Sequence, residues 1–172
     1  MFIGHFAPAL VVAARPNAAG LGTLFVAAQL VDIGFAVLLV PGIEAMRIVP
    51  GITAMNPMDL YHMPYTHSLL GSAVFAAAFG ALVLGLTKSR AAGAIAALVV
   101  LSHWFMDLLV HVPDLTLAGS PPKLGLGLWN HPAIEMPLEL GLTFGALWLY
   151  VRARRPAPLR VGVLAVVLLA LQ

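Results

Sequence analysis

Four apolar stretches divide this sequence, and each is long enough to cross the hydrocarbon core of a bilayer, which needs about 20 helical residues. They are Gly20–Val40, His67–Thr87, Ala91–Val110 and Ile134–Val151. Two shorter apolar pieces, Phe2–Ala14 and Leu159–Leu171, would reach only ~20 Å at ~1.5 Å per residue. We therefore predict an all-α fold: a polytopic transmembrane helix bundle with four full spans plus one or two shorter membrane helices. Residues 1–172 form a single integral membrane domain in this prediction.

The composition excludes several classes of protein. Hydrophobic residues make up 61% of the chain and charged residues only 9%, whereas a soluble domain has about 45–50% and about 25%. So few charges cannot cover a water-exposed surface, which argues against a soluble enzyme, a disordered chain or a nucleic-acid binder. The sequence has no cysteine, so it has neither disulfides nor a thiolate metal site.

The positive charges indicate how the bundle is oriented. If the four spans alternate, seven basic residues lie on one side: Arg15, Lys88, Arg90, Arg152, Arg154, Arg155 and Arg160. Only Arg47 and Lys123 lie on the other side. The positive-inside rule therefore predicts that the N-terminal side and the short basic loops are cytoplasmic, and that the long loops 41–66 and 111–133 are extracytoplasmic.

Ionisable residues inside the spans mark where chemistry would occur. The acids and histidines within or at the edges of the spans are Asp32, His103, Asp107, Glu135 and Glu139. Counted at ~1.5 Å per residue from the basic ends, they lie about 17–26 Å up, and His5 lies about 15 Å up. An ionisable group in the bilayer costs several kcal/mol, so it is usually paired and functional. We expect these groups to meet in one layer of the membrane.

Two stripes of imidazole and carboxylate repeat every four residues, which places their members on one helical face. They are His103, Asp107 and His111 in the third span, and His131, Glu135 and Glu139 in the fourth. Imidazole and carboxylate together suit a divalent cation such as zinc, manganese or magnesium. The cation would also offset the repulsion between clustered carboxylates. The spacing therefore predicts a divalent metal site, of unspecified identity and number of ions.

Each residue also has a simpler interpretation. His5 alone could be a hydrogen-bonded core histidine, and Asp32 could form an interhelical hydrogen bond with Gln29. Glu44 and Asp59 are expected to be solvated loop charges. A further pair, Thr66 and Ser68, could simply cap the second span.

Several short motifs resemble those of a known family. The run Tyr-Thr-His-Ser-Leu-Leu-Gly at 65–71 is similar to the THSLL motif of small bacterial inner-membrane proteins described as membrane-bound metal-dependent hydrolases. Ser-His-Trp-Phe-Met-Asp at 102–107 resembles their second motif, a histidine followed four residues later by aspartate. Gly4-His5 resembles their opening pair, and Asp32 occupies the place of their acidic motif. The resemblance covers roughly residues 4–114.

The resemblance implies a bacterial inner-membrane location and a set of metal ligands. His67, His103 and Asp107 would bind the metal, and His5 and Asp32 would complete the set. The chain departs from the family at 30–34, where Leu-Val-Asp-Ile-Gly replaces a proline-aspartate pair that is followed by a second aspartate and a histidine. His62, in the following loop, is a candidate replacement for the missing histidine.

The predicted function is a membrane-embedded metal-dependent hydrolase whose site opens towards the extracytoplasmic leaflet. Glu135 or Glu139 would act as general base on a water at the metal, and His111 or His131 would hold the leaving group or headgroup. The expected substrate is an amphiphilic or lipid-linked ester or phosphoester, and the expected partners are membrane lipids.

Two alternatives stay open. One is a proton or metal-ion transport protein, although the cytoplasmic halves of the second and third spans carry no ionisable residue. The other is an accessory subunit of a larger membrane complex with a vestigial metal site.

Overall fold

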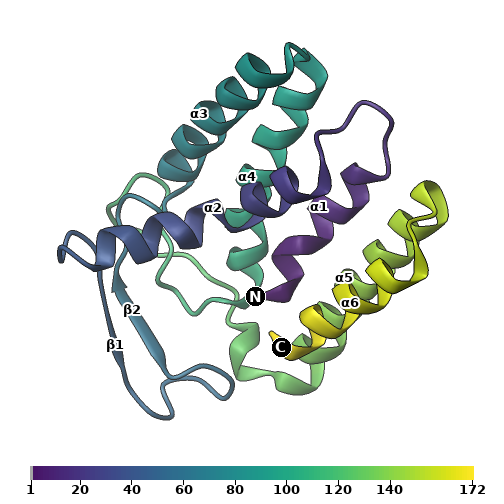
Figure 1. Ribbon diagram of the computed structural model, residues 1–172. Helices are drawn as coiled ribbons and strands as arrows, with labels where there is room; N and C mark the ends of the chain where they lie inside the picture. Colours follow the sequence, from purple (N-terminus) through teal and green to yellow (C-terminus); the bar gives the residue numbers. More distant parts are fainter. Residues whose placement is uncertain (1) are drawn as a thin grey trace.

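Six α-helices carry the fold of residues 2–172, the part of the chain that the computed structural model describes (Figure 1). They are α1 (Phe6–Ala13), α2 (Leu21–Leu39), α3 (Leu69–Thr87), α4 (Arg90–Val110), α5 (Pro132–Arg154) and α6 (Pro158–Ala170). Two 3₁₀-helices, η1 (Ile3–His5) and η2 (Leu128–Asn130), precede α1 and α5. A pair of strands, β1 (Ala45–Ile48) and β2 (Met58–His62), lies between α2 and α3.

The four predicted spans are confirmed as helices α2, α3, α4 and α5, each long and apolar enough to cross a membrane. Only 22–44% of each apolar window is buried inside the protein, so most of each span presents aliphatic side chains outward, as a lipid-facing surface requires. The shorter helices α1 and α6 also form where short apolar pieces were expected. The chain is therefore an integral membrane protein by the length and composition of its helices.

The β-hairpin departs from the all-α prediction. Strands β1 and β2 pair antiparallel, with Ala45 opposite His62 and Ile48 opposite Met58. The hairpin places Met46, Met58 and Leu60 in the wall of a cavity beside the helices. Its pairing depends on this tertiary packing, because an isolated two-stranded hairpin is marginal in water, and so the sequence alone did not indicate it.

The helices pack most closely where α3 and α4 form an antiparallel pair near the turn that joins them (Figure 1). A Cβ added at Gly93 would lie 2.7 Å from the carbonyl oxygen of Gly80, and one at Gly80 would lie 2.9 Å from that of Gly93. Small residues let helix backbones approach in this way, which strengthens dispersion contacts where no hydrophobic effect acts between helices.

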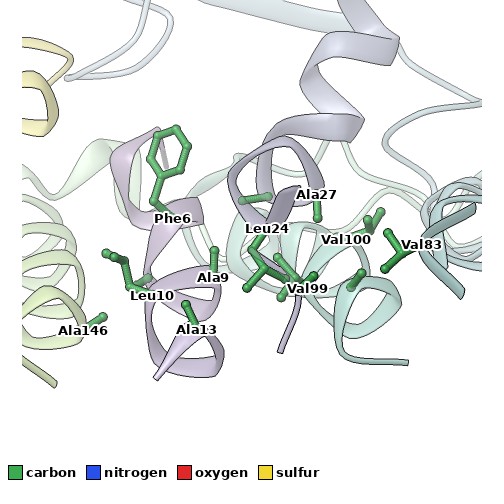
Figure 2. Close-up of a cluster of buried hydrophobic side chains, with 14 of the residues drawn as sticks. Phe6, Ala9, Leu10, Ala13, Leu24, Ala27, Val83, Val99, Val100 and Ala146 are labelled. Atoms are coloured by element: carbon green, nitrogen blue, oxygen red, sulfur yellow. The ribbon is translucent and has the colours of Figure 1, made fainter. Parts of the chain in front are cut away.

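Helix α1 lies inside the bundle and contacts α2, α4 and α5. Figure 2 shows Ala9 of α1 on the side of Leu24 of α2, and Leu10 on the opposite side, towards Ala146 of α5. The short first helix therefore serves as core, and this explains why an eight-residue helix can be apolar all round.

The start of α3 is fixed by its cap residue and by the long loop 111–133. The Ser68 side chain accepts a hydrogen bond from the Gly71 N–H, so Ser68 is the N-cap, as one interpretation of the sequence proposed. Two more free N–H groups, of Leu69 and Leu70, donate to the carbonyls of Thr116 and Leu117. Because of these bonds, the residue just before the helix, His67, has a fixed position.

Candidate metal centre

Four separate segments bring the predicted metal ligands together. His5 comes from η1, Asp32 from the middle of α2, His67 from the turn before α3, and His103 and Asp107 from α4. All are buried except Asp32, whose side chain is 36% exposed. The prediction that these groups meet in one place is confirmed, and buried histidine and aspartate groups that could hold a metal ion are present.

A cavity of about 440 Å³ opens beside this cluster. Its polar residues are His5, Asp32, Asn56, His67, Asp107, His111, Glu135 and Glu139. The rest of its wall is almost entirely apolar and includes Phe35, Leu39, Met46, Met55, Met58 and Trp129. The cavity is thus lined both by the histidines and carboxylates and by apolar side chains, to which the β-hairpin contributes.

His103 presents an electron lone pair to the cluster. Its Nδ1 lies 2.8 Å from the carbonyl oxygen of Ala28, which can only accept, so Nδ1 carries the hydrogen. In the neutral ring Nε2 is then an acceptor, yet it faces Asp107 Oδ2 at 3.0 Å and Asp32 Oδ1 at 3.5 Å. Nε2 has no hydrogen-bond partner among residues 2–172. Only a cation, either a proton or a metal ion, makes this contact between acceptors favourable.

His67 is held in the same tautomer by a chain of hydrogen bonds. Glu44 Oε1 accepts from the N–H groups of Tyr65 and Thr66 at 2.9 Å each, and Glu44 Oε2 accepts from the Thr66 hydroxyl at 2.6 Å. The Thr66 hydroxyl donates its only hydrogen to Glu44, so towards His67 it can act only as an acceptor, and it accepts from His67 Nδ1 at 2.9 Å. His67 Nε2 therefore presents its lone pair, 3.4 Å from Asp32 Oδ1 and 3.7 Å from Asp107 Oδ2. Such support of the remote nitrogen is typical of histidines that bind metals.

The spacing of these four donor atoms fits a tetrahedral ion. The four measured separations among the His67 and His103 Nε2 atoms and the carboxylate oxygens are 3.0, 3.4, 3.5 and 3.7 Å. A tetrahedron with metal–ligand bonds of about 2.1 Å has edges of about 3.4 Å, the mean of these values. The ring planes of His67 and His103 stand 74° apart, so their in-plane lone pairs can converge on one point. The donor types and these four nitrogen–oxygen separations are therefore compatible with a tetrahedral divalent cation.

His5 and His111 approach Asp107 from its other oxygen. His5 Nε2 lies 3.0 Å from Asp107 Oδ1, and His111 Nε2 lies 3.5 Å from the same atom. His111 Nδ1 is bonded to Asp114 Oδ1 at 2.8 Å, so its Nε2 also faces the cluster. Burial opposes the charged form of His111, but the carboxylates of Asp107 and Asp114 outweigh burial and raise its pKa above the ordinary value.

The two predicted candidates for general base differ sharply. Glu139 Oε1 accepts from the Gly4 N–H at 2.8 Å and Oε2 accepts from the Gln172 side chain at 3.3 Å. Glu135, one turn earlier on α5, is fully buried, and neither of its oxygens has a hydrogen-bond partner among residues 2–172. Both line the cavity. Glu139 is therefore a structural tie to the N-terminal segment, whereas Glu135 has its oxygens available.

Two histidines do not join the site. His131, predicted to hold a leaving group, is exposed and precedes α5 as its N-cap. Helix α5 starts at Pro132, so His131 has a non-helical backbone and does not share the helical face of Glu135 and Glu139. His62, the candidate replacement ligand, is exposed at the end of β2. Neither lines the cavity, so we leave both out of the site.

Sequence reasoning missed the role of Glu44, which was expected to be a solvated loop charge. It is fully buried and accepts three hydrogen bonds around His67. Thr66 was interpreted as a helix cap, but its hydroxyl connects Glu44 to His67. No spacing rule links residues 22 positions apart in a loop, so only the folded chain reveals this contact.

Comparison with protein-family models, curated proteins and solved structures gives no match for this chain. The resemblance of its short motifs to the membrane-bound metal-dependent hydrolases stays a prediction.

Proposed function

We propose that this protein is a membrane-embedded, metal-dependent hydrolase of amphiphilic esters or phosphoesters. The observation that carries the proposal is the convergence of His67, His103, Asp32 and Asp107, whose nitrogen–oxygen separations of 3.0–3.7 Å match those around a tetrahedral ion. All of these except His103 also line the cavity. Both histidines have Nδ1 bonded to an acceptor, which leaves Nε2 for a cation. In this proposal these four residues hold zinc.

A bound zinc ion would supply Lewis acidity, which acidifies water and polarises a carbonyl or phosphoryl oxygen. Glu135 would accept a proton from water in the cavity, because it lines the cavity and its oxygens have no hydrogen-bond partner among residues 2–172. Glu139 would hold Gly4, and with it His5, against the cluster.

The substrate class follows from the wall of the cavity. Phe35, Leu39, Met46 and Met58 would cover a hydrocarbon chain, while the histidine and aspartate end would receive the polar bond. Met is flexible enough to fit chains of different shape. A cavity of this kind, on a bundle with lipid-facing helices, suits a substrate that enters from the bilayer or its interface.

Transport receives less support, because a conducting path needs polar groups along its length. Within α3, and between Ala91 and Ser102 of α4, the sequence has no acid, base or histidine. The cluster therefore ends inside the bundle. The accessory-subunit alternative differs from our proposal in outcome, since a vestigial site would bind metal without hydrolysing any substrate.

Metal analysis of detergent-purified protein is the first test. We expect bound zinc after dialysis against the metal, and its loss in His103→Ala and Asp107→Ala. His62→Ala is the matched control, because this histidine is exposed and does not line the cavity. Wild-type protein without metal would mean that protons occupy the cluster, which would then be a buried ion-pair network, and the proposal would be wrong.

Hydrolysis is the second test. Zinc-loaded protein would be assayed against a panel of phospholipids, lipid phosphates and acyl esters, with Glu135→Gln as the catalytic variant. We expect this variant to keep its metal and lose 10²–10⁴-fold in rate, the usual contribution of a general base. Metal binding with no turnover across the panel would favour the accessory-subunit alternative.

A further inference from the structure

We infer that the cluster holds two cations, bridged by Asp107, and that His5 and His111 belong to the second one. This inference rests on the proposed metal centre and adds a site to it. The first site is the set of His67, His103, Asp32 and Asp107 Oδ2 described above.

The stacking of two rings carries the argument. His5 and His103 lie parallel, with ring centroids 3.7 Å apart and planes only 4° from each other. Imidazole binds a metal through a lone pair that lies in the plane of its ring. Because the planes of His5 and His103 are parallel, their two lone pairs cannot point to the same ion. A single ion about 2.1 Å from both Nε2 atoms would lie about 60° out of each ring plane. The two histidines therefore point at different ions, although their donor atoms and Asp107 lie within 4.8 Å of one another.

The two oxygens of Asp107 divide the histidines in the same way. Oδ2 faces His103 at 3.0 Å and His67 at 3.7 Å, whereas Oδ1 faces His5 at 3.0 Å and His111 at 3.5 Å. A carboxylate that places one oxygen in each of two histidine sets is the geometry of a bridging ligand. Bridged pairs of this kind hold their ions about 3.5–4 Å apart.

The second site differs from the first in the number of its ligands. His5, His111 and Asp107 Oδ1 supply three donors, whereas the first set supplies four. Zinc sites with four protein ligands are closed, and sites with three leave a position for water or substrate. Glu135, fully buried with both oxygens lacking hydrogen bonds within residues 2–172, lines the same cavity and would face that open position. With two ions bound, the open position would therefore lie at the second ion; with one ion bound in the first set, water would have to join as a fifth ligand.

Counting ions per chain tests the inference. Detergent-purified protein would be stripped with a chelator, dialysed against zinc and measured by elemental analysis against protein concentration. We expect two ions per wild-type chain, one in His5→Ala and in His111→Ala, and two in the control His62→Ala. One ion per wild-type chain would contradict this inference and leave the proposed function standing, whereas no ion would contradict both. Retention of both ions by His5→Ala, or loss of both, would contradict the assignment of His5.

Spectroscopy of the unmutated protein guards against variants that fail to fold. Loaded with Mn²⁺ to saturation, the wild-type protein should give the electron paramagnetic resonance spectrum of a spin-coupled pair, and at low loading that of isolated ions. A spectrum of isolated ions at saturation would contradict the bridged pair. This readout does not depend on any substrate being turned over.

Discussion

The same two helices, α3 and α4, behave differently at their two ends. Near the turn that joins them, Gly80 and Gly93 bring the backbones into direct contact, and the ionisable groups there are the two basic residues at the turn, Lys88 and Arg90. At the other end the helices enclose His67, His103 and Asp107, with the Trp104 N–H bonded to the His67 carbonyl at 3.2 Å. One end of the pair is closed by packing, and the other surrounds a polar cluster.

The difference shows where stability and function reside in this bundle. Small residues at the closed end contribute dispersion contacts that need no partner from outside the chain. The open end gathers acceptors that repel one another, so in the proposed function its stability depends on a bound cation. The two ends should therefore respond to different perturbations, and each prediction below tests that separation.

The largest effect is expected from removing metal. If zinc is present at a thousand times its dissociation constant, chelation should cost about 4 kcal/mol of stability. Thermal unfolding in detergent, followed by tryptophan fluorescence, would show this as a lower midpoint for the wild type. Asp107→Ala, which removes the residue shared by both proposed ions, should unfold at the same temperature with and without chelator. An equal response of this variant would place the metal away from the cluster.

The closed end should be sensitive to a single methyl group. Gly93→Ala places a Cβ 2.7 Å from the Gly80 carbonyl oxygen, so the helices must separate, at about 1–3 kcal/mol. Gly85→Ala is the matched control on α3, because nothing lies within 4 Å of its Cβ, and alanine there should stabilise the helix by about 0.5–1 kcal/mol. Both midpoints should shift without any change in metal content. Equal stability of Gly93→Ala and Gly85→Ala would show that the close contact between α3 and α4 does not stabilise this end of the pair.

Glu44→Gln should weaken the open end through the tautomer of His67. The glutamine oxygen must accept the Tyr65 and Thr66 N–H groups, so its NH₂ faces the Thr66 hydroxyl and donates to it. The hydroxyl then turns its hydrogen towards His67 Nδ1, which moves the ring hydrogen to Nε2. Zinc affinity should fall about 10–100-fold, or about 1.4–2.7 kcal/mol.

The tautomer itself is measurable from the ¹⁵N shifts of His67 in the metal-free protein. Asp59→Asn is the control, since this carboxylate pairs with the exposed Arg47 on the hairpin, outside the cavity. An unchanged His67 tautomer in Glu44→Gln would refute the proposed hydrogen-bond chain.

The smallest effect is expected on α5, next to the polar cluster. Thr143 follows Glu139 by one turn on α5, is fully buried, and its hydroxyl has no hydrogen-bond partner among residues 2–172. Thr143→Val removes an unsatisfied group of the same shape, so stability should rise by up to about 1 kcal/mol. Metal content should stay constant. A clear loss of stability would indicate that the hydroxyl has a water or ligand partner, and would extend the polar region along α5.

The helices of the bundle were predictable because the bilayer enforces a simple rule on sequence. A span needs about 20 apolar residues, and each of the four stretches became a helix within a few residues of its expected ends. The clustering of histidines and aspartates was also predictable. His103 and Asp107 lie one turn apart on α4, and counting residues placed Asp32 and His5 in the same layer.

What the sequence could not show depends on contacts between distant segments. The hairpin of β1 and β2, the burial of Glu44 beside Thr66, and the different partners of Glu135 and Glu139 each join residues with no periodic relation. The parallel stacking of His5 on His103 is of the same kind.

By itself, then, the sequence determined that the chain enters a membrane and which acids and imidazoles share a depth there, because hydrophobic length and helical rise act locally along the chain. Only the tertiary structure decided how those groups face one another, which nitrogen of each ring carries its hydrogen, and which carboxylate is left without a partner. Those properties depend on directions and distances between helices, which packing alone sets.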